Sequence, residues 1–225
     1  MGDYVGDNRW IPQGQSADEA GKLIWSTKSI NELMLALDQG YRPSVSMPFY
    51  EGKQFLRRGN IVFDYTDAEI TDLAKCANDI VYFAEKYAVV MTDNGVQQVK
   101  LRDYQKQMLR DFQHNRFNIV LASRQMGKTV TASIFNAWYL TFNYDKTTLL
   151  LANKSESTKE IIDKAKVVLE NLPFFMKPGI IKYDVMNVRA DNGCRLVGQS
   201  TTAKSGIGFT IHNLYLDEFA HIHPT

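Results

Sequence analysis

The clearest prediction of the fold comes from VLASRQMGKTVTASIF, residues 120–135. Ala122 is followed by four residues and then by Gly127, Lys128 and Thr129, which is the phosphate-loop pattern G-x-x-x-x-G-K-[ST] with alanine in place of the first glycine. Small residues let the backbone curl so that successive N–H groups point at phosphate oxygens. The lysine would reach the β- and γ-phosphates, and the threonine hydroxyl would help to hold Mg²⁺. The pattern therefore predicts a nucleotide site.

The segments on both sides of this pattern agree with that prediction. FNIVLA, residues 117–122, is short, apolar and rich in β-branched side chains, which predicts a strand. TVTASIFNAWYLTF, residues 129–142, predicts a helix. The buried side of this helix would carry Val130, Ile134, Ala137, Trp138 and Leu140. A strand, a loop and a helix in this order aim the helix N-terminus at an anion, which argues against the alternative of a chance match in a loop.

Composition limits the class of protein. The 225 residues are 44% hydrophobic, which is enough for one large domain, with or without an appendage. Lys and Arg total 26 against 25 Asp and Glu, so a surface that binds nucleic acid would have to be a local basic patch. Cys76 and Cys194 lie far apart without metal-site spacing, which suits a reducing cytoplasm. With no apolar run near the roughly 18 residues of a membrane span and no signal peptide, we expect a soluble intracellular protein.

The N-terminal part predicts little regular structure. Residues 1–60 are rich in Gly, Pro and polar side chains, and they contain one convincing short helix, SINELMLALDQG at residues 29–40. We expect a loosely structured arm, in which four basic side chains lie in a solvated loop or, alternatively, touch phosphate. These four residues are Arg42, Lys53, Arg57 and Arg58.

A strong amphipathic pattern follows. Residues 66–90 predict one helix, which begins with a capping box formed by Thr66 and Glu69. Its apolar stripe would consist of Ile70, Leu73, Ala77, Ile80, Val81, Ala84 and Tyr87. VVMTDNGVQQVKL, residues 89–101, predicts a hairpin because its Asn-Gly pair suits a two-residue turn.

LRDYQKQMLRDF, residues 101–112, predicts a helix that leads towards the phosphate loop. Its residue of interest is Gln105. A glutamine amide can donate to and accept from the Hoogsteen edge of adenine at the same time. Two interpretations stay open with equal weight: a contact to adenine, or an ordinary polar position on the helix.

Strand and helix patterns continue after the loop helix. KTTLLLAN, residues 146–153, predicts a buried strand. Residues 155–172 predict a helix with Ser157 and Glu160 as a capping box. Residues 180–200 predict two strands joined at the Asp-Asn-Gly turn.

HNLYLDEFAH, residues 212–221, predicts a strand that ends in two acids, Asp217 and Glu218. Downstream of a phosphate loop, such an ending is typical of an enzyme that hydrolyses nucleotide. Asp217 would bind Mg²⁺ and Glu218 would polarise the attacking water. P-loop kinases generally lack this glutamate, so the pair indicates hydrolysis coupled to work. A solvated strand end is the alternative for the acids alone, and the upstream loop disfavours it.

Four segments together, LRDYQKQM, LASRQMGKTV, DNGC and LYLDEFAHI, resemble the large terminase subunit of tailed double-stranded-DNA phages, especially its T-even-like branch. The resemblance covers residues 66–225. In that family the phosphate loop typically opens with Ser-Arg-Gln rather than Gly, as Ser123, Arg124 and Gln125 do here. One departure is Ser205-Gly206, where relatives tend to carry Arg-Gly.

The resemblance implies a role for each matching residue. Arg124 would sense the γ-phosphate and promote hydrolysis, and Lys128 would contact the phosphates. Thr129 and Asp217 would hold the metal, and Glu218 would be the catalytic carboxylate. ATP would be bound by Gln105, Ser123, Arg124, Gln125, Met126, Gly127, Lys128 and Thr129.

The family also implies a fold and a function. The fold would be an α/β P-loop NTPase of the RecA-like kind, with a mostly parallel sheet flanked by helices, in which residues 61–225 form the ATPase domain after the arm at residues 1–60. ATP hydrolysis with Mg²⁺ would drive viral DNA into the procapsid. The implied partners are double-stranded viral DNA, the portal protein of the procapsid and the small terminase subunit. The site of action would be the cytoplasm of the infected bacterial host, transiently at the procapsid portal.

In P-loop ATPases with a catalytic glutamate, a further strand follows the acidic one and inserts between it and the phosphate-loop strand. The sequence ends seven residues after Glu218 (225 minus 218), so we expect that strand and the family's nuclease domain to be missing. The missing C-terminal part of the terminase would then be a further partner, and the isolated fragment would be a poor ATPase. The alternatives are a fragment of a DNA helicase or translocase ATPase, and a fragment that binds nucleotide without turnover.

Overall fold

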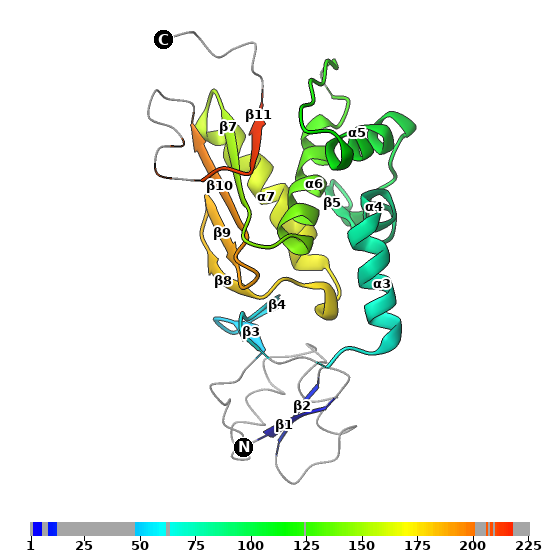
Figure 1. The fold of residues 1–225 in the computed structure, drawn as a ribbon, viewed down its shortest axis with the longest axis vertical. Coiled ribbons are helices and arrows are strands. Elements are labelled where there is room, and N and C mark those ends of the chain that lie inside the picture. Colours follow the sequence, from blue (N-terminus) through cyan, green and yellow to red (C-terminus); the bar gives the residue numbers. More distant parts are fainter. Residues whose placement is uncertain are drawn as a thin grey trace.

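The computed structural model describes residues 2–5, 9–12, 48–61, 64–123, 125–200, 206, 208 and 210–217. The helix expected at residues 29–40 lies outside them. The described chain is an α/β structure in which helices pack on a mixed sheet of five strands (Figure 1). No helix within these ranges has both the length and the apolar character needed to cross a membrane.

The sheet has the strand order β11-β7-β10-β9-β8. Three of its strands run parallel, namely β10 (Arg195–Ser200), β7 (Thr147–Ala152) and β11 (Asn213–Leu216). β9 (Asn187–Ala190) and β8 (Ile180–Tyr183) extend the sheet in antiparallel pairs. The expected mostly parallel sheet is therefore a mixed one, and β8, β9 and β10 replace the two strands expected there. Short turns join these three strands, and such turns can connect only antiparallel neighbours.

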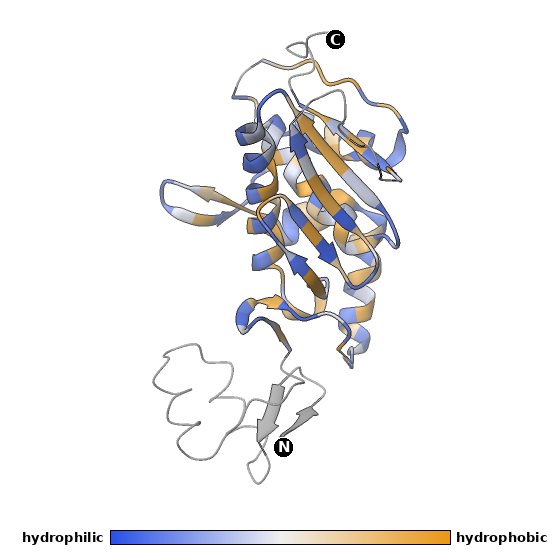
Figure 2. Cartoon of the chain, turned by 90° about the vertical axis from the view of Figure 1, so that its left-hand side faces the viewer, coloured by the Kyte–Doolittle hydropathy of each residue, from blue (hydrophilic) through white to orange (hydrophobic). Residues whose placement is uncertain are grey.

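The helices lie on one face of this sheet. α7 (Ser155–Asn171) packs on β7 and β10, α6 (Lys128–Phe142) packs on α7, and α5 (Asp103–His114) packs on α6 (Figure 1). Because neighbours cover α6 on several sides, residues 131–138 are all buried, which confirms the predicted loop helix. Figure 2 looks onto the other face of the sheet, across which no described helix runs.

Three small antiparallel strand pairs lie outside this sheet. β1 (Gly2–Val5) pairs with β2 (Arg9–Pro12), and β3 (Phe49–Tyr50) pairs with β4 (Lys53–Arg57). The predicted hairpin at residues 89–101 is confirmed, with its two strands β5 and β6 joined at residues 93–94 instead of at the Asn-Gly pair. These two strands are β5 (Val89–Thr92) and β6 (Gly95–Gln98).

Arg57 corrects the expectation of a solvated basic loop before residue 60. Its side chain is buried, and its Nη1 donates to the carbonyl of Lys177 at 3.3 Å and to the hydroxyl of Tyr65 at 3.0 Å. Phe49 packs edge-on against Phe174, in a short 3₁₀ turn, with a ring-centroid distance of 6.0 Å. Long-range contacts of this kind join β3 and β4 to the segment that leads into β8, and local sequence patterns do not reveal them.

The single helix expected at residues 66–90 is divided into α3 (Asp67–Asn78) and α4 (Ile80–Tyr87). The chain breaks at Asp79, whose carboxylate accepts the N–H groups of Val81 at 2.8 Å and Tyr82 at 3.1 Å. Aspartate favours such a helix cap over a helix interior because it satisfies N–H groups that have no intrahelical partner.

The break also changes the expected apolar stripe. Ile70 is 52% exposed, whereas Cys76, which lay outside the expected stripe, is fully buried. The capping box of Thr66 and Glu69 is confirmed. In α7 the expected capping box is wrong: the helix begins at Ser155, so Ser157 lies inside the first turn.

The segment FNIVLA, residues 117–122, is not a strand. Ile119 is 99% and Leu121 100% exposed, and Phe117 is 81% exposed. A β-strand needs a neighbour for its N–H and C=O groups, and β11, the end strand of the sheet, pairs only with β7 among the described residues. The apolar sequence is therefore suited to a strand, but no strand partner lies beside it in the described structure.

Candidate nucleotide-binding site

Residues 125–127 form a sharply turned loop in front of α6. Its backbone is left-handed at Gln125 (φ 62°) and again at Gly127 (φ 72°). Glycine adopts this conformation without strain, whereas a glutamine does so rarely. Gly127 is also the N-cap residue of α6, so the first N–H groups of the helix, which lack partners within it, open at the end of the loop.

Lys128 folds back over this loop. Its Nζ donates to the carbonyl oxygen of Ala122 at a distance of 2.8 Å. The side chain of Lys128 therefore reaches back to Ala122, the first residue of the phosphate-loop pattern. Thr129, in the first turn of α6, is half-buried, while Ser123 and Gln125 are exposed.

Gln105 lies against the loop from the side of α5. It is 7% exposed, and its Oε1 accepts the N–H of Arg102 at 3.0 Å. Its Nε2 donates to Thr131 Oγ1 at 3.3 Å, and a Cβ placed on Gly127 would lie 2.6 Å from the same nitrogen. One N–H and one lone pair of the amide remain for another partner. The contact to adenine therefore stays a prediction, but Gln105 clearly belongs to the surroundings of the loop.

Two residues at the loop were not found from the sequence. The Tyr104 hydroxyl donates to the carbonyl oxygen of Met126 at 2.9 Å. Thr131 donates from Oγ1 to the carbonyl of Gly127 at 3.1 Å, while it accepts from Gln105. Tyr104 stands in the motif LRDYQKQM, but neither residue type nor spacing indicates that its hydroxyl reaches a backbone carbonyl 22 positions away.

The acidic end of the site lies at the end of β11. Asp217 follows this strand directly, and its N–H donates to Leu151 O of β7 at 2.9 Å. Tyr215 donates to Asp217 Oδ1 at 3.4 Å. Burial, and then the nearby carboxylate, raise the pKa of Tyr215, so its hydroxyl keeps its proton. Figure 1 shows the end of β11 and the start of α6 at the same end of the molecule. Ligands of open α/β sheets bind at this carboxyl edge.

Arg124 and Glu218, to which the sequence gives the roles of phosphate sensor and catalytic carboxylate, lie outside the described residues. The structure brings Gln105 and Lys128 together around the loop, and it leads the chain to Asp217 at the carboxyl edge of the parallel strands.

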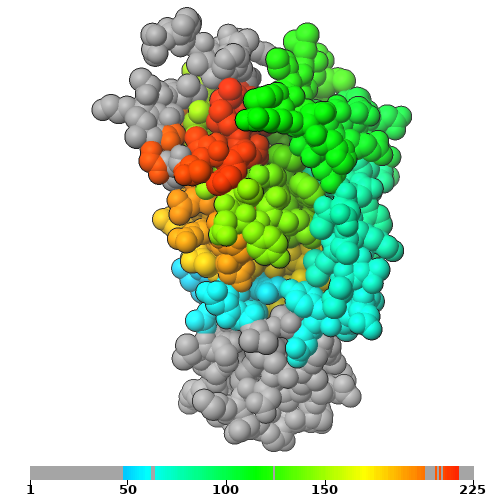
Figure 3. Space-filling view, viewed as in Figure 1, coloured from blue at the N-terminus to red at the C-terminus, as the bar shows by residue number. Residues whose placement is uncertain are grey.

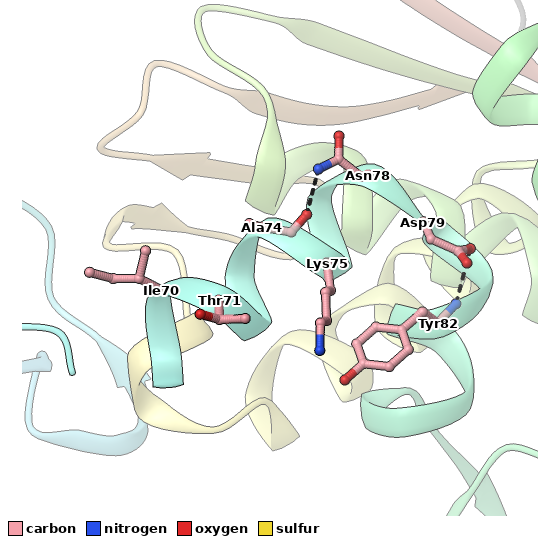
Figure 4. A pocket seen from close by; sticks show the side chains of 7 residues that line it. All are labelled: Ile70, Thr71, Ala74, Lys75, Asn78, Asp79 and Tyr82. Carbon is pink, nitrogen blue, oxygen red and sulfur yellow. Dashed lines mark hydrogen bonds between the residues drawn. The ribbon is translucent and has the colours of Figure 1, made fainter. Parts of the chain in front are cut away.

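A different concave surface lies on α3 and α4 (Figure 4). This groove has a volume of about 620 Å³. The Asn78 amide donates to the Ala74 carbonyl, and Asp79 caps α4. The residues that line the groove are Ile70, Thr71, Ala74, Lys75, Asn78, Asp79 and Tyr82. None of them is part of the loop or of α6.

The second half of the chain matches a known protein family. Residues 119–224 match the family described as terminase large subunit, T4likevirus-type, N-terminal. The matched region runs from the loop segment through α6, β7, α7 and the strands to β11, and it contains both the phosphate-loop pattern and the two acids. α5, with Tyr104 and Gln105, lies before it. The resemblance seen in the sequence motifs is thereby confirmed for residues 119–224, which match the N-terminal part of T4-like terminase large subunits.

Proposed function

We propose that this chain is the ATP-hydrolysing part of a motor that packages phage DNA. The observation that carries the proposal is the loop, which is left-handed at Gln125 and Gly127 in front of α6 and whose Ala122 carbonyl accepts a hydrogen bond from the Lys128 ammonium group. The match of residues 119–224 to the large terminase family supports the packaging role, because these subunits are generally nucleotide-dependent packaging motors.

The residues present fit ATP with its Mg²⁺. Lys128 holds a backbone carbonyl that a phosphate oxygen can replace, and the free N–H groups at the start of α6 suit the same anion. Thr129 supplies a hydroxyl and Asp217 a carboxylate, which are oxygen ligands of the kind that Mg²⁺ prefers. When bound, the metal would offset charge on the phosphates.

Each remaining residue has a separate task in this proposal. Glu218 takes the proton of the attacking water, and Arg124 offsets charge on the transferred phosphoryl group. Gln105 recognises adenine with the remaining N–H and the remaining oxygen lone pair of its side-chain amide. The backbone of Ser123, Gln125 and Met126 surrounds the phosphates.

The overall fold proposed for the chain is the P-loop NTPase fold. It is supported by the parallel strands β10, β7 and β11 with α6 and α7 on their face. The ATPase domain would span residues 61–225, after the arm at residues 1–60. The partners would be double-stranded viral DNA, the portal protein, the small terminase subunit and the C-terminal part of the terminase, in the host cytoplasm and at the portal.

The test is ATP turnover by the chain mixed with DNA, procapsids and the C-terminal part of a T4-like terminase. Glu218→Gln should retain ATP binding and stop hydrolysis. Arg124→Ala should lower turnover by roughly 10³-fold with a smaller change in affinity, since an arginine of this kind acts most as charge moves. Hydrolysis by Glu218→Gln at the parental rate would refute the assignment of the base. Stimulation by single-stranded DNA alone, without any response to procapsids, would instead indicate a helicase.

A further inference from the structure

We infer that Tyr104 is a positioning residue that holds the phosphate loop in its ligand-binding shape, an inference that rests on the nucleotide site proposed above. The starting observation is the 2.9 Å hydrogen bond from the Tyr104 hydroxyl to the carbonyl oxygen of Met126. Met126 lies between Gln125 and Gly127, the two left-handed positions of the loop. The bond therefore fixes the orientation of the peptide plane between two tight turns.

This peptide needs support from outside the loop. A left-handed conformation is unfavourable at a residue other than glycine, and the loop carries one at Gln125, which is exposed. The carbonyl of Met126 and the N–H of Gly127 belong to the same peptide group, so they point in opposite directions. Holding the carbonyl towards Tyr104 thus turns the N–H away from α5.

Gln105, the next residue of α5, supports the following part of the loop. Its Nε2 donates to Thr131 Oγ1, and Thr131 in turn donates to the Gly127 carbonyl at 3.1 Å. Two adjacent side chains in the first turn of α5 therefore reach consecutive carbonyls of the loop, Tyr104 directly and Gln105 through one hydroxyl. α5 therefore holds the loop from one side through these two side chains.

The test removes only the hydroxyl, by Tyr104→Phe, and compares hydrogen exchange of the amides at residues 125–128 in the full chain without nucleotide. We expect these amides to exchange about three- to tenfold faster, the range that follows from losing one net hydrogen bond. Tyr144→Phe is the matched control, because Tyr144 is 76% exposed and follows the other end of α6. Equal exchange in Tyr104→Phe and the parent would overturn the inference.

A second measurement, ATP affinity, tests whether the contact from Tyr104 matters for ligand binding. ATP affinity in the presence of Mg²⁺ should fall by a similar three- to tenfold in Tyr104→Phe, because binding must then order the loop, while Tyr144→Phe binds as the parent does. If the parent binds ATP and Tyr104→Phe binds it equally well, the shape that Tyr104 holds is not the binding shape, and the inference fails. If the parent itself binds no ATP, the proposed function fails, and the exchange comparison still decides whether Tyr104 holds the loop.

Discussion

Gly127 meets two separate demands at the phosphate loop. Its φ of 72° favours glycine, and an added Cβ would lie 2.6 Å from Nε2 of Gln105. Gly52 has a nearly equal φ of 74° but nothing within 4 Å of an added Cβ. Gly127→Ala should therefore lose ATP affinity by at least about tenfold, whereas Gly52→Ala should lose about 1 kcal/mol of stability and bind ATP normally. Calorimetric titration and urea unfolding check both variants, and normal ATP binding by Gly127→Ala would contradict the loop geometry.

Lys177 makes stability depend on pH. Burial lowers its pKa from 10.5 to about 8, although the nearby Glu170 carboxylate opposes this shift. Its Nζ donates to the carbonyls of Phe55 and Glu170. Between these pKa values the unfolded chain holds a proton that the folded chain has released, so this group adds to the free energy of unfolding as pH rises.

The free energy of unfolding of the parent should therefore rise relative to that of Lys177→Met between pH 8 and pH 9.5. Buried Cys76 and Cys194, whose pKa values are raised, act in the opposite direction, so the difference between the two proteins is the quantity to measure by urea unfolding. Lys182→Met serves as the control, since Lys182 is half exposed. A difference that stays constant with pH would show that Lys177 keeps its charge in the folded chain.

Residue types and spacing predicted Gln105, Lys128 and Asp217 as site residues, since each belongs to a motif whose chemistry is local. They did not locate Tyr104 or Lys177. Each of these side chains donates to a backbone carbonyl of a segment far along the chain, and every residue has such a carbonyl. A sequence pattern carries no signal for this kind of contact, so only the fold reveals it.

Periodicity predicted α5, α6, β7 and α7, because each is long or strongly apolar on one side. Periodicity gave wrong predictions where the pairing with a neighbouring strand decides whether a segment forms a strand. Residues 117–122 have the composition of a strand but lack a paired strand in the described structure. The β8–β9–β10 meander was expected as two strands, because its strands β8 and β9 are only four residues long.

The junction of α3 and α4 depends on the helix cap at Asp79. Asp79 ends an otherwise continuous amphipathic pattern by accepting two N–H groups of α4. Asp79→Ala should lower the free energy of unfolding by about 1 kcal/mol, whereas Asp79→Asn, which retains a cap acceptor, should change it by much less. Urea unfolding measures both. Equal stability of all three proteins would mean that the break has another cause.

At the scale of the whole molecule, the edge of the sheet at β11 has no strand partner among the described residues. β11 is the end strand, Leu214 on it is 50% exposed, and Figure 3 shows this strand (red) at the surface. The apolar side chains of Ile119 and Leu121 are almost fully exposed. An uncovered strand edge and exposed apolar side chains both favour association with another chain.

The chain should therefore associate increasingly with concentration, and the double substitution Ile119→Lys with Leu121→Lys should reduce this association. Met91→Lys is the control, because Met91 is 63% exposed on the β5–β6 hairpin. Sedimentation velocity over a range of concentrations distinguishes them. A monomeric parent at every concentration, or an equal effect of the control, would contradict this role of the exposed segment.

The most direct measurement of the central claim is calorimetric titration of the chain with ATP in the presence of Mg²⁺. The parent should bind one ATP per chain, Lys128→Ala should lose at least about tenfold in affinity through the loss of a charged contact to phosphate, and Lys182→Ala should bind as the parent does. A parent that binds no ATP, or a Lys128→Ala variant that binds it with parental affinity, would contradict the account.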